Sequence, residues 1–166
     1  MRNPAARLVL VSLFLVLILL PDSAYGQSGR KVFDEKQNAL LDFEAAQAQA
    51  KSEHKNIVLD FGANWCQSCL AWDKFSHENT ELAKSLENGY VVLHITTGAF
   101  FDSKQVTTIR KRYPKFRGVP HMMIVANDGT LLHDLDFDRD IADMKIKQWR
   151  TETLIALFAK YTPSKN

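Results

Sequence analysis

The chain of 166 residues has only two cysteines, Cys66 and Cys69, which stand two residues apart. They follow an apolar run, Ile57 to Phe61, and come at the head of a segment with helical character. Unpaired amides and the helix dipole stabilise a thiolate at the first turn of a helix, so we expect Cys66 to ionise more easily than a free thiol. Cys69 lies one turn later, where its sulfur can attack a mixed disulfide formed at Cys66. This spacing predicts thiol–disulfide exchange, with Cys66 as nucleophile and Cys69 as resolving thiol.

Other roles for the cysteine pair stay open. Structural zinc needs four ligands, and the chain has no second cysteine pair and no His-x3-His pattern. An inert disulfide would fit an oxidising compartment, although so short a loop constrains the unfolded chain little. His121 invites a Cu(I) site with the two thiolates, but successive strand residues face opposite sides. We expect no metal and no other cofactor.

The remaining histidines show no mutual ligand spacing, and we expect surface or packing roles for them. They are His54, His77, His94 and His133.

The beginning of the chain is typical of a secretory signal. Two arginines precede a thirteen-residue apolar run from Leu8 to Leu20, and Ala24 and Gly26 occupy the small-residue positions of a cleavage site. We predict a signal peptide over residues 1–26 and a flexible lead over 27–31. An uncleaved anchor is the alternative, although a membrane-spanning helix needs about 20 apolar residues.

The rest of the chain alternates between apolar runs and helical patterns, which predicts one α/β domain over residues 32–162 and a tail over 163–166. The expected elements are a helix capped by Asp34, a strand at Ile57–Phe61, helical segments from Cys66 to a left-handed stop at Gly89, a strand at Tyr90–Ile95, a helix capped by Ser103, a hairpin around Asn127–Gly129, and a last helix that contains Trp149 and ends at Thr162. Strands separated by helices pair in parallel, and the hairpin adds an antiparallel edge. A mixed sheet with helices on both faces follows.

Length and charge limit the partners. The net charge is +2, from 21 basic and 19 acidic residues, so nothing indicates nucleic acid as a partner. A domain of this length buries a sizeable core without disulfide staples. We therefore expect a monomer in which the cysteine pair is not needed for stability.

The run IVLDFGANWCQSC, followed by Gly118, Val119 and Pro120 and then by the hairpin, resembles the thioredoxin superfamily. It is most similar to exported or periplasmic thioredoxin-like domains such as the C-terminal domain of DsbD. The resemblance covers the chain from about its first helix to its last, and it implies a thioredoxin-like three-layer fold.

The resemblance also implies roles for single residues. Trp65 and the cysteine pair match the active-site motif, and Pro120 matches the cis-proline that exposes the backbone of Val119 to a substrate strand. Trp65, Val119 and Pro120 would thus bind substrate. Asp60 matches the buried acid that moves a proton to or from the resolving cysteine. Burial raises the pKa of a carboxylate toward the range that this role requires.

Four positions depart from the family pattern. Val92 stands where cytosolic thioredoxins have a lysine beside the buried acid, so Asp60 should be less stabilised as an anion. Lys74 and Ser68 replace two prolines, and Gly62 replaces a tryptophan. These differences argue against a general cytosolic thioredoxin.

The expected function is therefore an exported thiol–disulfide oxidoreductase. Gln67 and Ser68 supply no charge that would stabilise a thiolate, which favours a reductase or isomerase-like exchanger over a strong oxidant. Its substrates would be protein thiols or disulfides, and its electron donor a membrane or periplasmic thiol carrier. The periplasm is the expected compartment, with secretion or membrane anchoring as alternatives. The alternative function is a non-catalytic thioredoxin-fold binding protein or a copper-handling protein.

Overall fold

The computed structural model describes residues 31–98, 104–143, 145 and 147–164. The predicted signal peptide over 1–26, the lead over 27–30 and the Ser103 cap lie outside these residues. Within the described ranges, no helix combines the length and the apolar character that crossing a membrane requires.

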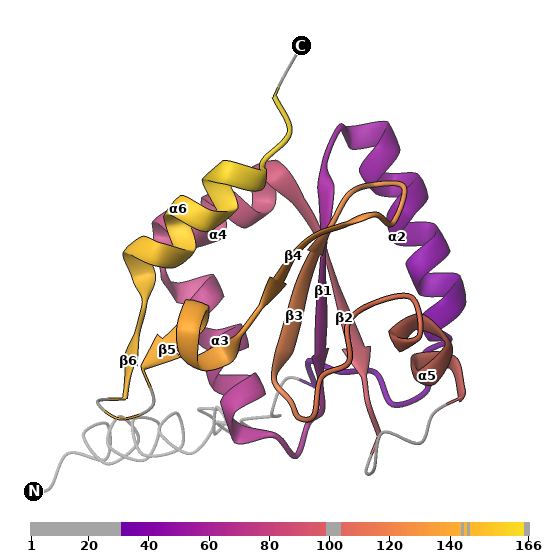
Figure 1. Ribbon diagram of the computed structural model, residues 1–166, viewed down its shortest axis with the longest axis horizontal. Helices are drawn as coiled ribbons and strands as arrows, with labels where there is room; N and C mark the ends of the chain where they lie inside the picture. Colours follow the sequence, from indigo (N-terminus) through magenta and orange to yellow (C-terminus); the bar gives the residue numbers. More distant parts are fainter. Residues whose placement is uncertain (1–30, 99–103, 144, 146, 165–166) are drawn as a thin grey trace, which may run out of the picture. The chain divides into compact units, whose positions relative to one another are not determined.

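A four-stranded mixed sheet forms the centre of the described part (Figure 1). In chain order the elements are α2 (Ala39–Glu53), β1 (Asn56–Gly62), α3 (Gln67–Glu78), α4 (Thr80–Gly89), β2 (Tyr90–Thr96), α5 (Lys104–Arg110), β3 (His121–Val125), β4 (Leu131–Leu135), the π-helical turn η1 (Phe137–Ile141), β5 (Ala142–Asp143), β6 (Gln148–Trp149) and α6 (Thr151–Tyr161). The strand order is β2-β1-β3-β4, with β1 parallel to β2 and antiparallel to β3. The predicted parallel pair and the predicted hairpin of β3 and β4 are both confirmed.

Helices cover both faces of this sheet, as Figure 1 shows. Side chains of α2 and α5 pack on one face with Ile57, Leu59 and Phe61 of β1. Side chains of α3, α4 and α6 pack on the other face, where β1 contributes Val58. Because successive strand residues point to opposite faces, a strand covered on both sides is almost wholly apolar, and this explains the run Ile57–Phe61 in β1, where Asp60 is the one charged residue. The predicted three-layer architecture is confirmed.

The first helix starts later than its predicted cap. Asn38 caps α2, and its side-chain oxygen accepts a hydrogen bond from the backbone N–H of Leu41 at 3.3 Å. Asp34 instead accepts from the backbone N–H of Lys36 at 2.8 Å. Aspartate stabilises such local turns as readily as helix ends, which is why the predicted Asp34 cap is wrong.

Two other predicted boundaries are also wrong. Gly89 is not a left-handed stop, because α4 runs directly into β2 through an extended Tyr90. A Cβ atom on Gly89 would lie 2.6 Å from Oγ1 of Thr162, so the close approach of the C-terminal segment favours glycine there. Trp149 belongs to β6 rather than to the last helix, and its ring stacks on Phe75 at 4.7 Å between centroids.

Candidate active site at the start of helix α3

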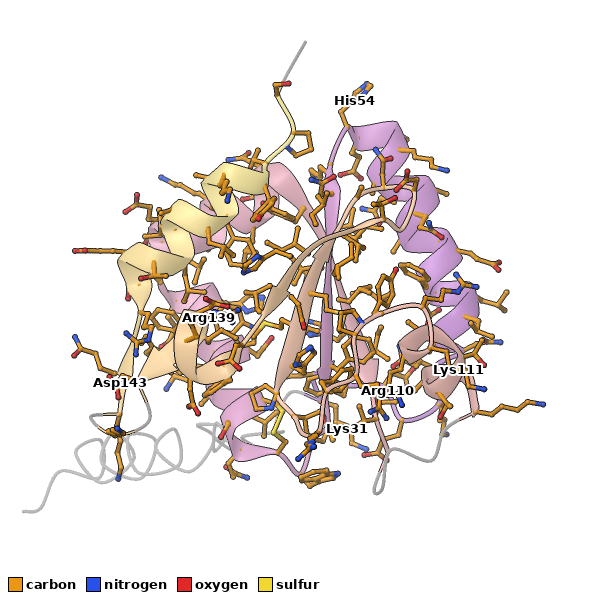
Figure 2. The ribbon with its side chains drawn as sticks, viewed as in Figure 1. Lys31, His54, Arg110, Lys111, Arg139 and Asp143 are labelled. Atoms are coloured by element: carbon orange, nitrogen blue, oxygen red, sulfur yellow. A yellow bond between two sulfur atoms is a disulfide. The ribbon has the colours of Figure 1, made fainter. Side chains whose placement is uncertain are left out.

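Cys66 and Cys69 form a disulfide at the amino end of α3 (Figure 2). The chain leaves β1 at Gly62 and turns into α3, for which Cys66 is the N-cap residue with φ −83° and ψ 101°. Sγ of Cys66 accepts a hydrogen bond from the backbone N–H of Cys69 at 3.2 Å, and the first turn of α3 holds no acidic side chain. This position at the positive end of the helix dipole favours a thiolate at Cys66 in the reduced protein.

A short segment before α2 covers the disulfide. Cys69 is fully buried and Cys66 is 5% exposed, and the buried ring of Phe33 packs against both. The side chain of Asn64 holds the backbone of Phe33 on both sides: Phe33 N–H donates to Oδ1 at 3.1 Å, and Nδ2 donates to the Phe33 carbonyl at 2.7 Å. Residues 32–35, here called the Phe33 segment, are thus fixed over the cysteine pair.

The Phe33 ring also explains the glycine that departs from the family pattern. A Cβ atom on Gly62 would lie 2.7 and 2.9 Å from Cε1 and Cε2 of Phe33, closer than atoms of this kind pack. The ring therefore occupies the space in front of β1 into which a side chain at position 62 would project. The absence of a side chain at Gly62 therefore leaves the space that the Phe33 ring needs to cover the cysteine pair.

Gly62→Ala is expected to displace the Phe33 ring, because the added methyl group has no space. Overpacking of this kind lowers the free energy of unfolding by about 1–3 kcal/mol. Thermal unfolding measures that loss, and the rate of Cys66 alkylation by iodoacetamide in the reduced protein should rise. Gly118→Ala is the matched control, since a Cβ atom there meets nothing within 4 Å. A melting temperature of Gly62→Ala equal to that of Gly118→Ala would contradict this account.

The loop before β3 lies beside the cysteine pair. Its Val119–Pro120 peptide bond is cis, as the resemblance implies, and Val119 packs against both cysteines and Phe33. Trp65 is 56% exposed at the surface, and its Nε1 donates to the carbonyl of Gly98 at 3.2 Å. A hollow of about 290 Å³ borders this indole. The structure thus places Val119 against the disulfide and leaves the Trp65 ring open to contact from outside.

Asp60 is the one acidic side chain within β1, and it is fully buried. Its Oδ2 lies 2.9 Å from Nδ1 of His94, its partner across the parallel register of β1 and β2. Burial raises the pKa of Asp60, and the negative charge of Asp73 adds to the rise, while the hydrogen bond and charge of His94 oppose it. Oδ1 of Asp60 has no hydrogen-bond partner among the described residues. The carboxyl group is thus suited to take up a proton.

His94, for which the sequence predicts a surface or packing role, packs on Phe33 and also contacts the buried Asp60. Val92 occupies the position of the family lysine. It lies two residues before His94 on β2 and is 39% exposed. Because side chains alternate along a strand, Val92 and His94 face the same side. The pairing of Asn56 with Tyr90, the first residues of the two strands, brings His94 opposite Asp60. Aligning the two predicted strands by their first residues, Ile57 and Tyr90, would have placed Leu93 opposite Asp60, so only the observed register reveals this pair.

His121 contacts an aromatic ring and an aspartate. Its ring stacks on Phe116 at 4.0 Å between centroids, and its Nε2 lies 2.7 Å from Oδ1 of Asp134. Burial lowers the pKa of His121, and the charge of Asp134 opposes this shift. In the part of the chain that the structure describes, no group of three or more His, Cys, Asp or Glu side chains could hold a metal ion. The structure therefore gives the copper alternative no support.

Known proteins with related sequences share the region of the motif. A family model described as thioredoxin-like matches residues 37–127. The thiol:disulfide interchange protein DsbD of Vibrio cholerae is 37% identical over 57 residues, which cover 32% of this chain and 9% of that protein. The chain thus spans a small fraction of this curated relative.

Solved structures share the fold. A disulphide isomerase from Xylella fastidiosa Temecula1 superposes with a TM-score of 0.64 and 26% identity, over 80% of this chain and 98% of that one. The oxidised C-terminal domain of DsbD from Neisseria meningitidis gives a TM-score of 0.53 and 22% identity, over 75% and 96% of the two chains. With the family match over more than half of its residues, the chain belongs to the thioredoxin-like family.

Proposed function

We propose that this protein is an exported thiol–disulfide oxidoreductase that exchanges disulfides with protein substrates through Cys66 and Cys69. One observation carries the proposal: a disulfide at the amino end of a helix, with a cis-proline loop packed against it. The similarity to a disulphide isomerase and to DsbD, whose names describe disulfide chemistry, supports the same activity.

In the reducing direction, the Cys66 thiolate attacks one sulfur of a substrate disulfide, and the other substrate sulfur leaves as a thiolate. Cys69 then gives its proton to the Asp60 carboxylate and attacks Sγ of Cys66. The Cys66–Cys69 disulfide forms again, the second substrate sulfur leaves, and two electrons have passed to the substrate. The burial of Cys69 and Asp60 and the open Oδ1 of Asp60 support this assignment of the proton acceptor.

Substrate recognition would use the surface around the disulfide. The backbone of Val119 would pair with an extended substrate segment, as the family resemblance implies, next to Pro120. The exposed Trp65 ring and the hollow beside it offer an apolar contact for a substrate side chain. Because Cys66 is 5% exposed, a substrate sulfur reaches it only when the Phe33 segment gives way. The rate of Cys66 alkylation in Gly62→Ala tests whether the Phe33 segment limits access to this sulfur.

The expected redox direction is reductase or isomerase-like. The first turn of α3 carries no acidic side chain, and the two residues between the cysteines, Gln67 and Ser68, are uncharged, so the thiolate gains only what the helix end provides. Equilibration with glutathione is expected to give a potential nearer to that of thioredoxin, about −270 mV, than to that of DsbA, about −120 mV. A potential near the DsbA value would contradict the proposed direction.

We further propose the periplasm as the compartment and a membrane or periplasmic thiol carrier as the electron donor. The signal-like first 26 residues and the similarity to DsbD support both proposals. An oxidising compartment does not supply electrons by itself, so a reductase there depends on such a donor. The protein would act as a monomer on protein thiols and disulfides, without a cofactor.

A further inference from the structure

The proton chemistry of Asp60 requires a partner. Asp60 is fully buried, and burial raises its pKa because it disfavours the carboxylate form that must accept the proton. On the side of the cysteines the cover is apolar, since the Phe33 ring packs on both sulfur-bearing residues. The same ring meets the edge of the His94 ring at 5.5 Å between centroids. His94 therefore contacts both the apolar cover and the Asp60 carboxyl group.

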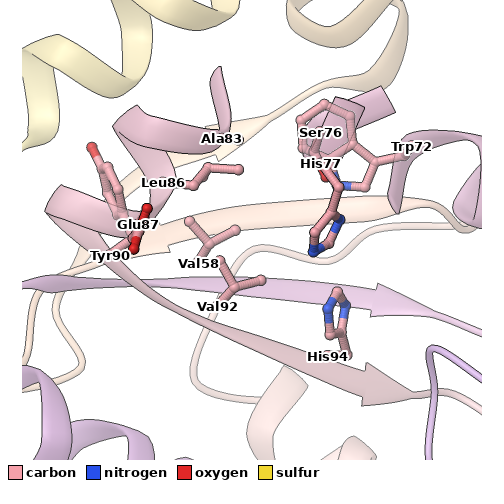
Figure 3. Close-up of a pocket in the computed structure, with 10 residues that line it drawn as sticks. All are labelled: Val58, Trp72, Ser76, His77, Ala83, Leu86, Glu87, Tyr90, Val92 and His94. Atoms are coloured by element: carbon pink, nitrogen blue, oxygen red, sulfur yellow. The ribbon is translucent and has the colours of Figure 1, made fainter. Parts of the chain in front are cut away.

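His94 opens onto a cavity. This cavity has a volume of about 330 Å³ and lies between β2, α3 and α4 (Figure 3). His94 enters it from β2, and His77 enters it from α3, with the two rings on facing sides. The side chain of His77 is 53% exposed and Val92 is 39% exposed, so the cavity reaches the surface. Small solutes and solvent can therefore approach His94 without passing the disulfide.

A series of ionisable groups connects Asp60 with that surface. Nδ1 of His94 lies 2.9 Å from Asp60, and its Nε2 lies 3.9 Å from Oδ1 of Asp73. The same oxygen of Asp73 lies 3.5 Å from Nδ1 of the exposed His77. Glu87 of α4 also lines the cavity, and the aromatic ring of Phe33 contacts His94 from the other side of the site. The groups around His94 are thus mainly acidic, and they stabilise its protonated form.

We propose that His94 is the proton-exchanging partner of Asp60: as an imidazolium it keeps Asp60 ionised, and it releases a proton to solvent when Asp60 takes the proton of Cys69. This inference rests on the proposed oxidoreductase function and assigns a further residue to it. His94 acts on Cys69 only through Asp60. It is therefore a positioning residue rather than a catalytic one.

Each proton transfer in this scheme has a named donor and a named acceptor. When Cys69 is deprotonated, its proton passes to the open Oδ1 of Asp60, while the proton between Oδ2 and Nδ1 of His94 stays in place and the imidazolium releases its Nε2 proton to solvent in the cavity. When a donor later reduces the Cys66–Cys69 disulfide, Cys69 leaves as a thiolate. It regains a proton from Oδ1 of Asp60, and Nε2 of His94 takes up a proton from solvent, so the pair returns to its starting state. The two electrons pass only between sulfur atoms.

The test follows the two steps separately. Reduced protein is mixed in a stopped-flow instrument with 5,5′-dithiobis(2-nitrobenzoic acid), whose first thionitrobenzoate reports attack by Cys66 and whose second reports attack by Cys69. In His94→Ala we expect the first release to stay within about twofold of wild type. The second release should be at least about tenfold slower at pH 7, as expected for the loss of a proton-transfer group.

The pH profile and chemical rescue separate proton transfer from a merely structural role. The hydrogen bond and charge of His94 lower the pKa of Asp60, so without this partner Asp60 ionises only at higher pH, and the pH profile of the second step in His94→Ala should move to higher pH. Imidazole enters through the cavity and should restore the rate at pH 7 in proportion to its concentration, whereas pyrazole, a ring of the same size and a much weaker base, should not. His94→Gln, which lacks the ring, should be slowed as well.

His133→Ala is the matched control. His133 also lies on the central sheet, with a side chain 25% exposed against 26% for His94, and it also contacts an aspartate, Asp140 at 3.5 Å. Its second step should equal that of wild type, and an equal shift in this variant would overturn the proposal.

Three further outcomes would also overturn it. They are a wild-type second step in His94→Ala, a loss that imidazole does not restore at any pH, or, if His94→Ala fails to fold, a wild-type second step in His94→Gln. A wild-type protein that releases no thionitrobenzoate would instead refute the oxidoreductase function itself.

Discussion

Cys66→Ser is expected to lower the rate of insulin disulfide reduction by at least about 10³-fold, to the level without protein, because a hydroxyl cannot replace the attacking thiolate. Turbidity of reduced insulin in the presence of dithiothreitol measures this rate. Cys66 caps α3 and Cys69 is fully buried, so the second cysteine has no equivalent access to a substrate sulfur. Turnover that survives Cys66→Ser would remove Cys66 from its assigned role.

Cys69→Ser provides the complementary result for the same pair. The first attack remains possible, but no thiol can release the captured substrate, so a mixed disulfide at Cys66 should accumulate. Non-reducing electrophoresis of such complexes, followed by mass spectrometry, would identify the physiological substrates and the electron donor. A Cys69→Ser protein that captures nothing while the wild type turns over would contradict the order of the two cysteines.

Asp60→Asn is expected to slow the attack by Cys69 by about 10²-fold, since an amide cannot accept the proton. The release of the second thionitrobenzoate measures this step. In contrast to His94→Ala, imidazole should not restore the rate at pH 7, because no carboxylate is left to accept the proton of Cys69. A wild-type second step in Asp60→Asn at pH 7 would show that Asp60 is not the base.

The same substitution should stabilise the fold at neutral and alkaline pH. Burial raises the pKa of Asp60 above its ordinary value of 3.8, so the folded protein holds a proton that the unfolded chain releases. The stability due to this proton is fully present below the ordinary value, and it is lost as the pH rises toward the raised pKa. We expect the melting temperature of Asp60→Asn to exceed that of wild type at pH 8 by about 3 °C or more, roughly 1 kcal/mol in a domain of this size.

The excess in melting temperature should shrink as the pH falls toward the ordinary pKa of 3.8 and below it, where Asp60 of the unfolded chain also becomes protonated. Glu44→Gln, which neutralises an exposed carboxylate on α2, is the control and should show no such pH-dependent gain. An Asp60→Asn protein that is less stable than wild type at pH 8 would contradict the direction of the pKa shift.

Local patterns determined much of the fold and the centre of the site. The apolar run of β1, the turn at Gly129 with φ 91° and the cysteine pair at a helix start are each decided by residues close in sequence. Strand periodicity and turn chemistry act over a few residues, so the sequence alone indicates them. The cysteine spacing, the motif around it and the following hairpin were therefore enough to predict the family and the fold class.

Contacts between distant residues were decided only by the tertiary structure. His94 meets Asp60 because two parallel strands, separated by α3 and α4, pair in one register out of several. Phe33 covers the disulfide because Asn64, 31 residues away, binds its backbone and because Gly62 leaves room for its ring. Neither pairing has a local pattern, since strand register and side-chain burial depend on how whole elements pack. The sequence alone determined which sulfur chemistry is available, and packing decided which groups cover the cysteines and which group exchanges protons with Asp60.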